Sequence, residues 1–131
     1  PPTGLPLPQV AGYSCLDPEL AGWKTKAAYP GKCAESNASP LPGCLKSGTF
    51  EEAYNFCGDA STRLCYVDDV LLAKNTGCNI NKKMIWTQSP CSDGGVVGFW
   101  TSLGRHQNGN QVLECRPINY SDAAARCCAD D

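Results

Sequence analysis

The sequence predicts a small, disulfide-rich α+β domain in which two short helices pack on an antiparallel sheet. Ten cysteines are spread along 131 residues, a density typical of a domain stabilised by disulfide bonds. One stretch has the periodicity of a helix with an apolar face, and several others alternate apolar and polar side chains as strands do. A helix and a sheet of this kind bury their apolar faces against each other in one core.

The first residues of the chain are rich in proline. Four of the ten prolines lie in residues 1–12, which carry no charged side chain. Such a segment favours extended polyproline II geometry without internal hydrogen bonds. We therefore expect an extended arm, 1–12, followed by a disulfide-stabilised globular domain, 13–131. Leu5, Leu7 and Val10 give the arm apolar contacts for docking on a partner; the alternative is a linker that folds back onto its own domain.

Prolines also interrupt the chain between residues 13 and 44, so this part is expected to be rich in loops. Residues 19–28, which include Trp23, are expected to form a short helix. Because periodicity predicts little regular structure here, we expect the cysteines to hold this part of the chain in place.

A helix is predicted most clearly after residue 48. Its buried face is defined by four residues at helical spacing: Phe50, Ala53, Tyr54 and Cys57. Thr49 and Glu52 have the spacing of a capping box, in which each side chain accepts a hydrogen bond from the other residue's backbone N–H. Gly58 can adopt the left-handed conformation that ends a helix.

The chain then alternates between strands and turns. Residues 64–67 read as a strand, and Asp68 caps a second helix that Gly77 ends. Residues 84–87 form another strand, and residues 89–95 are a cluster of turn residues.

The clearest hairpin consists of residues 96–102 and 111–116. Asn108–Gly109 between them accepts the positive φ angles of a tight turn. Residues 123–129 are apolar enough to form a last strand that enters the core. Together these stretches supply the antiparallel sheet.

The cysteines indicate the compartment. They are Cys15, Cys33, Cys44, Cys57, Cys65, Cys78, Cys91, Cys115, Cys127 and Cys128. An even number implies up to five disulfides, of open connectivity, and an oxidising environment. A metal site would need paired ligands at short spacing, usually with histidine, and the chain has one histidine, His106. We expect disulfides, and neither a metal nor another cofactor.

Cys127 and Cys128 are adjacent on the predicted last strand. Neighbouring side chains on a strand point to opposite faces, so each cysteine can bridge to a different layer. The alternative is a strained disulfide between the two, which would be sensitive to reduction.

The charge is nearly balanced. The formal net charge is −2, from 11 basic and 13 acidic residues, and only Lys82–Lys83 form a basic pair. A nucleic-acid or anionic-membrane binder needs clustered lysine and arginine, and a membrane span needs about 18 apolar residues in a row. We expect neither partner. Because the chain begins Pro-Pro-Thr, without a leader, we also expect a secreted, mature segment.

Catalytic chemistry has few candidates. His106 lies in a polar loop, where exposure is the default, although a serine–histidine–acid site needs a histidine base. Glu51–Glu52 and Asp68–Asp69 lie where helix starts favour negative charge, and Asp130–Asp131 is the chain end. An even cysteine count leaves no free thiol as a nucleophile. The sequence therefore predicts that the protein is not an enzyme.

Four residues are candidates for surface roles. Asn37 and Asn119 stand in N-glycosylation acceptor patterns, the first followed closely by Pro40. Phe99 and Trp100 are adjacent on a predicted strand and face opposite sides, so one of the two is a candidate for contact with a ligand such as a sugar.

One order of elements resembles a known family. A capped helix with Phe50 and Cys57, an R-L-C strand, a second helix, an M-I-W-T strand and a closing strand with cysteine is similar to the C-type-lectin-like domain. The R-C-C-A-D ending is also similar to cysteine-rich extracellular domains of algae and other protists, which have no settled function.

The resemblance covers residues 48–130 and implies part of the disulfide pattern. It implies that Cys57 pairs with Cys127 or Cys128, and Cys91 with Cys115. The E-P-N, Q-P-D and W-N-D motifs of calcium-dependent lectins are missing, so calcium-dependent sugar binding is not implied.

The function that these observations predict is structural or adhesive. We expect a secreted, non-enzymatic subunit of an extracellular fibre, coat or surface appendage, which docks head to tail on other copies through its Pro-rich arm. The alternative is a lectin-like, carbohydrate-binding module that lacks the usual calcium motif. The partners expected are other copies of the chain, or glycans.

Overall fold

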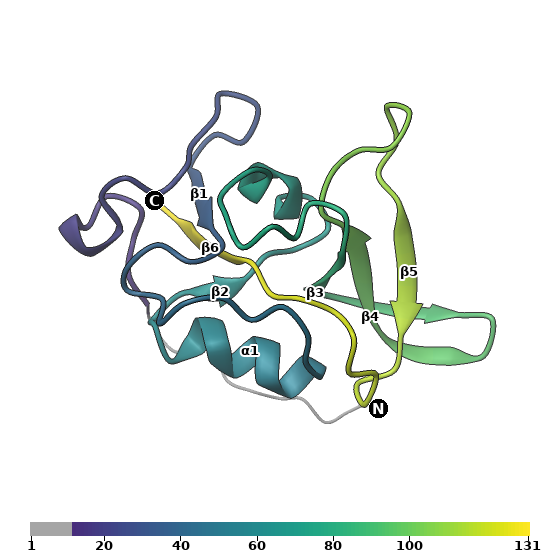
Figure 1. Cartoon of the computed structure of the whole chain (residues 1–131). Helices are drawn as coiled ribbons and strands as arrows, with labels where there is room; N and C mark the ends of the chain where they lie inside the picture. Colours follow the sequence, from purple (N-terminus) through teal and green to yellow (C-terminus); the bar gives the residue numbers. More distant parts are fainter. Residues whose placement is uncertain (1–11) are drawn as a thin grey trace.

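A computed structural model describes residues 12–131 (Figure 1). Its elements in chain order are the 3₁₀ helix η1 (Pro18–Leu20), β1 (Lys32–Glu35), α1 (Phe50–Gly58), β2 (Arg63–Leu64), the 3₁₀ helix η2 (Val70–Ala73), β3 (Met84–Asp93), β4 (Val96–Leu103), β5 (Leu113–Arg116) and β6 (Cys127–Asp130). The predicted α+β class is confirmed. The arrangement differs, because the described residues form one α-helix and two three-stranded antiparallel sheets.

The first sheet has the order β1-β6-β2. The last strand of the chain therefore lies in the middle, with Ala34 opposite Cys128 and Leu64 opposite Cys127. β6 begins only at Cys127, so the prediction of a strand over residues 123–129 was too long. Residues 123–126 are buried but run between the sheets, with Ala124 accepting the backbone N–H of Trp86 at 2.9 Å.

The second sheet has the order β3-β4-β5 and includes the predicted hairpin. Asn108 and Gly109 adopt the expected positive φ angles, 53° and 80°. β3 runs on to Asp93, so most of the residues predicted as a turn, 89–95, are strand. The turn itself is Gly94–Gly95, with φ of 59° and 87°. Register shifts between Trp86 and Pro90, and this bulge accommodates a proline that has no N–H to donate.

Helix α1 has the predicted N-terminal cap but a different end. The backbone N–H of Thr49 donates to Glu52 Oε1 at 2.8 Å, and the backbone N–H of Glu52 donates to Thr49 Oγ1 at 3.3 Å, which completes the capping box. Gly58 is not the left-handed residue that ends the helix; it lies within it. The chain continues through tight turns, and Ser61 takes the positive φ, 59°.

The other predicted helices are shorter than expected. The second helix is reduced to η2, whose N-cap residue is Asp69 rather than Asp68 and makes no side-chain cap bond. All four η2 residues are buried, so this segment lacks the polar face of a surface helix. The helix predicted over residues 19–28 is only η1, because Gly22 turns the chain with a φ of 90° and Trp23 enters the core.

Two hydrophobic clusters lie on opposite faces of the first sheet. One contains Phe50, Trp86 and Cys127, and the other contains Leu72, Ile85 and Cys128. In Figure 1, α1 runs below β2 and β6, while the second sheet with β4 and β5 projects to the right. The first sheet is therefore covered on both faces by short segments of the same chain.

All ten cysteines are paired, and they form the expected five disulfides. The pairs are Cys15–Cys33, Cys44–Cys78, Cys57–Cys127, Cys65–Cys128 and Cys91–Cys115. They include both pairings that the C-type-lectin-like resemblance implies. Cys127 and Cys128 bridge to opposite layers, and the alternative of a bond between them is wrong.

Candidate functional site

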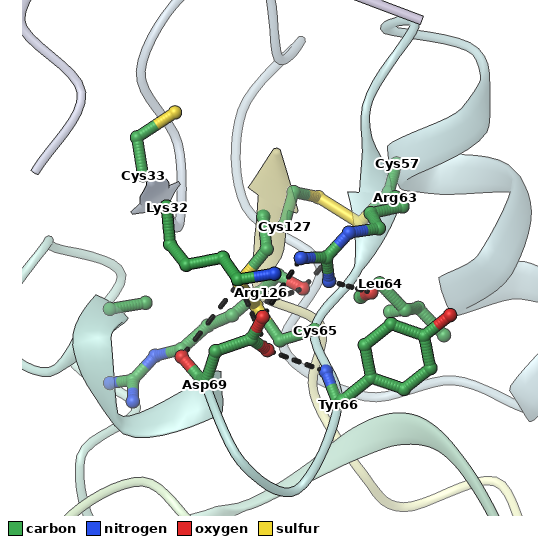
Figure 2. The surroundings of a disulfide bond; sticks show 12 residues. Lys32, Cys33, Cys57, Arg63, Leu64, Cys65, Tyr66, Asp69, Arg126 and Cys127 are labelled. Carbon is green, nitrogen blue, oxygen red and sulfur yellow. Dashed lines mark hydrogen bonds and ion pairs between the residues drawn. A yellow bond between two sulfur atoms is a disulfide. The ribbon is translucent and has the colours of Figure 1, made fainter. Parts of the chain in front are cut away.

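A cluster of four charged side chains lies where β1, β2 and β6 meet η2. This charge cluster consists of Lys32, Arg63, Asp69 and Asp130. The first three are labelled in Figure 2. Arg63 is its centre: Nη2 donates to Asp69 Oδ2 at 2.8 Å and to Asp130 Oδ1 at 2.9 Å, and Nε donates to Asp130 Oδ2 at 3.1 Å. Lys32 Nζ donates to Asp130 Oδ1 at 2.6 Å. One guanidinium thus joins two carboxylates from different elements.

Local structure positions the buried half of this cluster. Asp69 precedes η2, and its Oδ1 accepts the backbone N–H of Tyr66 at 2.7 Å, which fixes the turn between β2 and η2. The Asp69 side chain is 5% exposed and that of Arg63 is 13% exposed, whereas that of Asp130 is 50% exposed. Arg63 also lies over the ring of Tyr66, 4.9 Å from its centroid. Figure 2 shows Arg63 between Leu64, Asp69 and Tyr66.

The electrostatics keep the cluster ionised. Hydrogen bonding from Arg63 lowers the pKa of Asp130 to about 2, against the opposing effect of desolvation and with help from Lys32. Burial opposes the charge of Arg63, but hydrogen bonds to Asp130 and Asp69 outweigh it and raise the pKa of Arg63. An aspartate with so low a pKa holds no proton at neutral pH and is unsuited to general acid catalysis. The charge cluster holds β1, β2 and β6 and the residue before η2 together.

A pocket of about 270 Å³ adjoins the charge cluster. It is lined by Gly12, Tyr13, Ser14, Ser61, Thr62, Arg63 and residues 128–131. This arm-root pocket surrounds the point where residues 1–11 join the described chain. The backbone N–H of Tyr13 donates to Ser61 O and that of Cys15 donates to Asp130 O, both at 2.8 Å. A Cβ at Gly12 would lie 2.4 Å from Ser61 O, so the close approach requires glycine.

One group of side chains has the spacing of metal ligands. The ligand atoms of Cys65, Asp69 and Cys128 lie within 4.8 Å of one another. The two sulfurs are bonded to each other in a disulfide, however, and cysteine binds metal as a free thiolate. In its oxidised form this group does not fit a metal ion.

The two predicted ligand-contact residues have separate environments. Phe99 stacks on Phe50, with ring centroids 3.9 Å apart and planes 11° apart, and so belongs to the core side of the second sheet. Trp100 is half-buried and belongs to neither hydrophobic cluster. Phe99 thus packs on the core while Trp100 does not, and contact of either residue with a ligand stays a prediction. Trp86 is fully buried and donates its indole N–H to Gly48 O at 2.8 Å.

The remaining predicted site residues are dispersed. Asn37, Asn119 and His106 lie at exposed positions in different loops, and glycosylation of the two asparagines stays a prediction. Leu5, Leu7 and Val10, the predicted assembly contacts, lie outside the described residues, as does the arm up to residue 11. Of the acidic residues predicted at helix starts, Glu52 completes the capping box of α1. Asp69 is the N-cap residue of η2, but its side chain binds Arg63 and makes no cap bond.

Sequence analysis missed the role of Arg126. This side chain is fully buried; Nη1 donates to Gly104 O at 2.8 Å and Nη2 to Asn81 Oδ1 at 2.7 Å, while Nε has no partner among the described residues. Desolvation lowers its pKa to about 10. The sequence does contain a signal for this role: Arg126 is the one charged residue in the apolar run 123–129, and an arginine in a buried run needs hydrogen-bond partners. Arg126 holds two loops against the last strand.

Comparison with protein-family models, with curated proteins and with solved structures finds no match for this chain. Within residues 12–131, helices are all too short to cross a bilayer. The five disulfides indicate an oxidising, extracellular type of environment.

Proposed function

We propose that the protein is a secreted, non-enzymatic structural or adhesive subunit, which associates with further copies of itself through its Pro-rich arm. Such a subunit contributes to an extracellular fibre, coat or surface appendage. A contact in which the arm of one copy binds a different surface of the next is heterologous and propagates into a filament or a ring.

The anchoring of the arm is the observation that carries this proposal. Backbone hydrogen bonds from Tyr13 and Cys15 and the Cys15–Cys33 disulfide fix the arm's root to the first sheet. An uncharged, apolar segment thus leaves the domain from a rigid point. A rigid exit loses less entropy on docking than a long flexible linker would.

The chemistry of the described residues agrees with a structural role. The ten cysteines are held in disulfides, and the most buried carboxylate, Asp69, is neutralised by Arg63. Asp130 carries a lowered pKa and two cationic partners. Each of these groups has a function in holding elements together.

Removing the arm tests the proposal. We compare the full chain with a chain that starts at Gly12 and with a full-length triple variant, Leu5→Ser, Leu7→Ser and Val10→Ser, called the arm variant. Light scattering after size-exclusion chromatography and negative-stain microscopy should show assemblies for the full chain alone. Near-ultraviolet circular dichroism checks that each protein is folded. If assemblies persist unchanged in both altered chains, or if the full chain is monomeric, the proposal is wrong.

Trp100 favours a second candidate function, a lectin-like carbohydrate-binding module. Its half-buried ring belongs to neither core cluster and offers an aromatic face to a sugar. The Cys57–Cys127 and Cys91–Cys115 pairs support the C-type-lectin-like resemblance behind this candidate.

A glycan array measured with and without EDTA tests the lectin-like candidate. Selective binding that is insensitive to EDTA and is lost in Trp100→Ala, but kept in Tyr66→Ala, would support it. Tyr66 serves as the control because it is an exposed aromatic residue that lies far from Trp100 in the sequence. No selective signal from the folded protein would contradict it.

A further inference from the structure

The outer edge of β5 is uncovered by the described residues. Leu103 donates its backbone N–H to Val112 O at 2.9 Å, so residues 112, 114 and 116 are the ones that face β4. The backbone groups of Leu113 and Cys115 therefore point away from the sheet. Neither residue makes a backbone hydrogen bond to a described segment outside β4. An edge of this kind is a template for another strand.

The other sheet edges are covered, at least in part, by segments of residues 12–131. Lys24 exchanges two backbone hydrogen bonds with Ala34 on the outer side of β1. Ala124 exchanges two with Met84 and Trp86 of β3, and Gln88 of β3 donates its backbone N–H to Cys65 O. On β5, by contrast, the outward backbone groups of Leu113 and Cys115 bind no described segment.

The side chains beside this edge are apolar and uncharged on one face. Leu113 is 36% exposed and lies opposite Ser102, and Cys115 lies opposite Trp100. Paired residues share a face, so Leu113, Trp100 and the Cys91–Cys115 disulfide lie on the same side of the sheet. On the other face Glu114 and Arg116 form an ion pair with each other, which leaves the edge without a net charge.

The arm has the sequence pattern of an edge strand. In residues 5–9, Leu-Pro-Leu-Pro-Gln, the prolines occupy every second position. In an extended chain the backbone groups of Leu5, Leu7 and Gln9 point to one side, and Pro6 and Pro8, which have no N–H, point to the other. One side can therefore pair with a sheet, and the proline side prevents a further strand from adding.

We propose that residues 5–10 of one copy add as a fourth strand to the β5 edge of the next copy. The backbone groups of Leu5 and Leu7 pair with the outward groups of Leu113 and Cys115, as in other cases of β-strand addition. In an antiparallel pairing of this register, the leucine side chains lie on the face of Leu113 and Trp100. The inference rests on the proposed self-association and identifies the surface that receives the arm.

The root of the arm and the β5 edge are separate surfaces of the domain, because they belong to different sheets. The arm leaves beside β2 and β6, and β5 is the outer strand of the second sheet. Figure 1 shows the purple start of the described chain on the left and β5 on the right. Each copy therefore presents one donor and one acceptor, which gives a head-to-tail chain.

Two surface variants test the acceptor edge. Leu113→Lys places a charge at the edge, and Val97→Lys, the matched control, places the same charge on an exposed valine of β4. Size-exclusion chromatography with light scattering should show that Leu113→Lys needs at least tenfold more protein to assemble, whereas Val97→Lys assembles as the full chain does. Near-ultraviolet circular dichroism verifies folding. Assembly of Leu113→Lys at the original concentration would overturn the inference.

A mixing experiment separates this inference from the proposed function. The arm variant keeps the acceptor edge, and Leu113→Lys keeps the arm, so the two mixed together should form a one-to-one dimer and no larger species. If the arm variant fails to assemble but Leu113→Lys assembles fully, the arm binds elsewhere, and only the inference fails. If the arm variant and the chain that starts at Gly12 both assemble as well, the proposed function fails.

Hydrogen exchange distinguishes docking between copies from docking within one. In assemblies of the full chain, the amides of Leu113 and Cys115 should exchange at least tenfold more slowly than in the arm variant. The same protection in a full chain diluted to the monomer would show that the arm binds its own domain, and would overturn the contact between copies. Unchanged exchange in the assemblies would overturn the edge as the binding surface.

Discussion

Arg63 is the residue on which the charge cluster depends. It neutralises Asp69, whose side chain is 5% exposed, and it also binds the half-exposed Asp130. Truncation would leave a buried carboxylate without its cation, which is much more costly than losing a surface pair. We expect Arg63→Ala to lower the free energy of unfolding by about 3–5 kcal/mol.

Arg116 supplies the control for this prediction. It also forms an ion pair with an acidic residue, Glu114, but both side chains are at least a third exposed. Arg116→Ala should therefore cost no more than about 1 kcal/mol. Urea unfolding followed by tryptophan fluorescence measures both variants. Equal losses in the two would show that burial of Asp69 contributes nothing.

Asp130 makes the stability of the folded protein depend on pH in the acidic range. Its pKa in the folded state is about 2, below its ordinary value of 3.8. A lowered carboxyl pKa stabilises the folded state above the ordinary value, and this stabilisation is lost as the pH falls from about 4 to about 2. Because the side chain is half exposed, solvent screening reduces the effect to the order of 1 kcal/mol.

We therefore expect Asp130→Asn to flatten the stability profile in this pH window. Urea unfolding at several values between pH 2 and 5 should show a smaller loss of stability on acidification than in the unaltered chain. Asp93→Asn is the control, since Asp93 is exposed and forms no ion pair with a described residue. A profile for Asp130→Asn that parallels the unaltered chain would contradict the prediction.

At the scale of elements, the start of α1 is specified locally. Glu51 and Glu52 are both exposed acids in the first turn, but only Glu52 takes part in the capping box. We expect Glu52→Ala to cost about 1 kcal/mol more than Glu51→Ala, because it leaves the Thr49 N–H without its partner. Thermal and urea unfolding of the two variants measure the difference. Identical stabilities would argue against the box.

The elements that sequence patterns predicted well are those held together by near neighbours. The capping box joins residues three positions apart, and the Asn108–Gly109 turn lies within a short loop of its hairpin. η2 was predicted wrongly because its four residues are buried on all sides, and the apolar run Val70–Ala73 looks the same in a buried helix, strand or turn. Trp100 and Phe99 were told apart only by the stacking of Phe99 on Phe50.

At the scale of the whole molecule, two disulfides join β6, the central strand of the first sheet, to the hydrophobic clusters on both faces of that sheet. Cys127 binds Cys57 in one cluster, and Cys128 binds Cys65 in the other, with sequence separations of 70 and 63. Together the two bonds close a much longer loop than the 18-residue separation of Cys15–Cys33.

We expect the double variants Cys65→Ala/Cys128→Ala and Cys15→Ala/Cys33→Ala each to lose about 2–5 kcal/mol of stability. Guanidinium unfolding of the oxidised proteins measures both, and mass spectrometry of unreduced peptides verifies the remaining pairs. A loss well below about 2 kcal/mol for Cys65→Ala/Cys128→Ala would show that the adjacent Cys57–Cys127 bond already restricts the same part of the chain.

The sequence by itself determined the fold class, the disulfide-rich character, the capped helix and the hairpin turn, because these depend on composition or on residues a few positions apart. The features that depend on contacts between residues far apart in the sequence became visible only in the tertiary structure. Arg63 and Asp130 are 67 positions apart, and nothing in either neighbourhood indicates the other. The central place of β6 between β1 and β2 likewise depends on pairing between strands far apart in the sequence, which no local sequence pattern indicates.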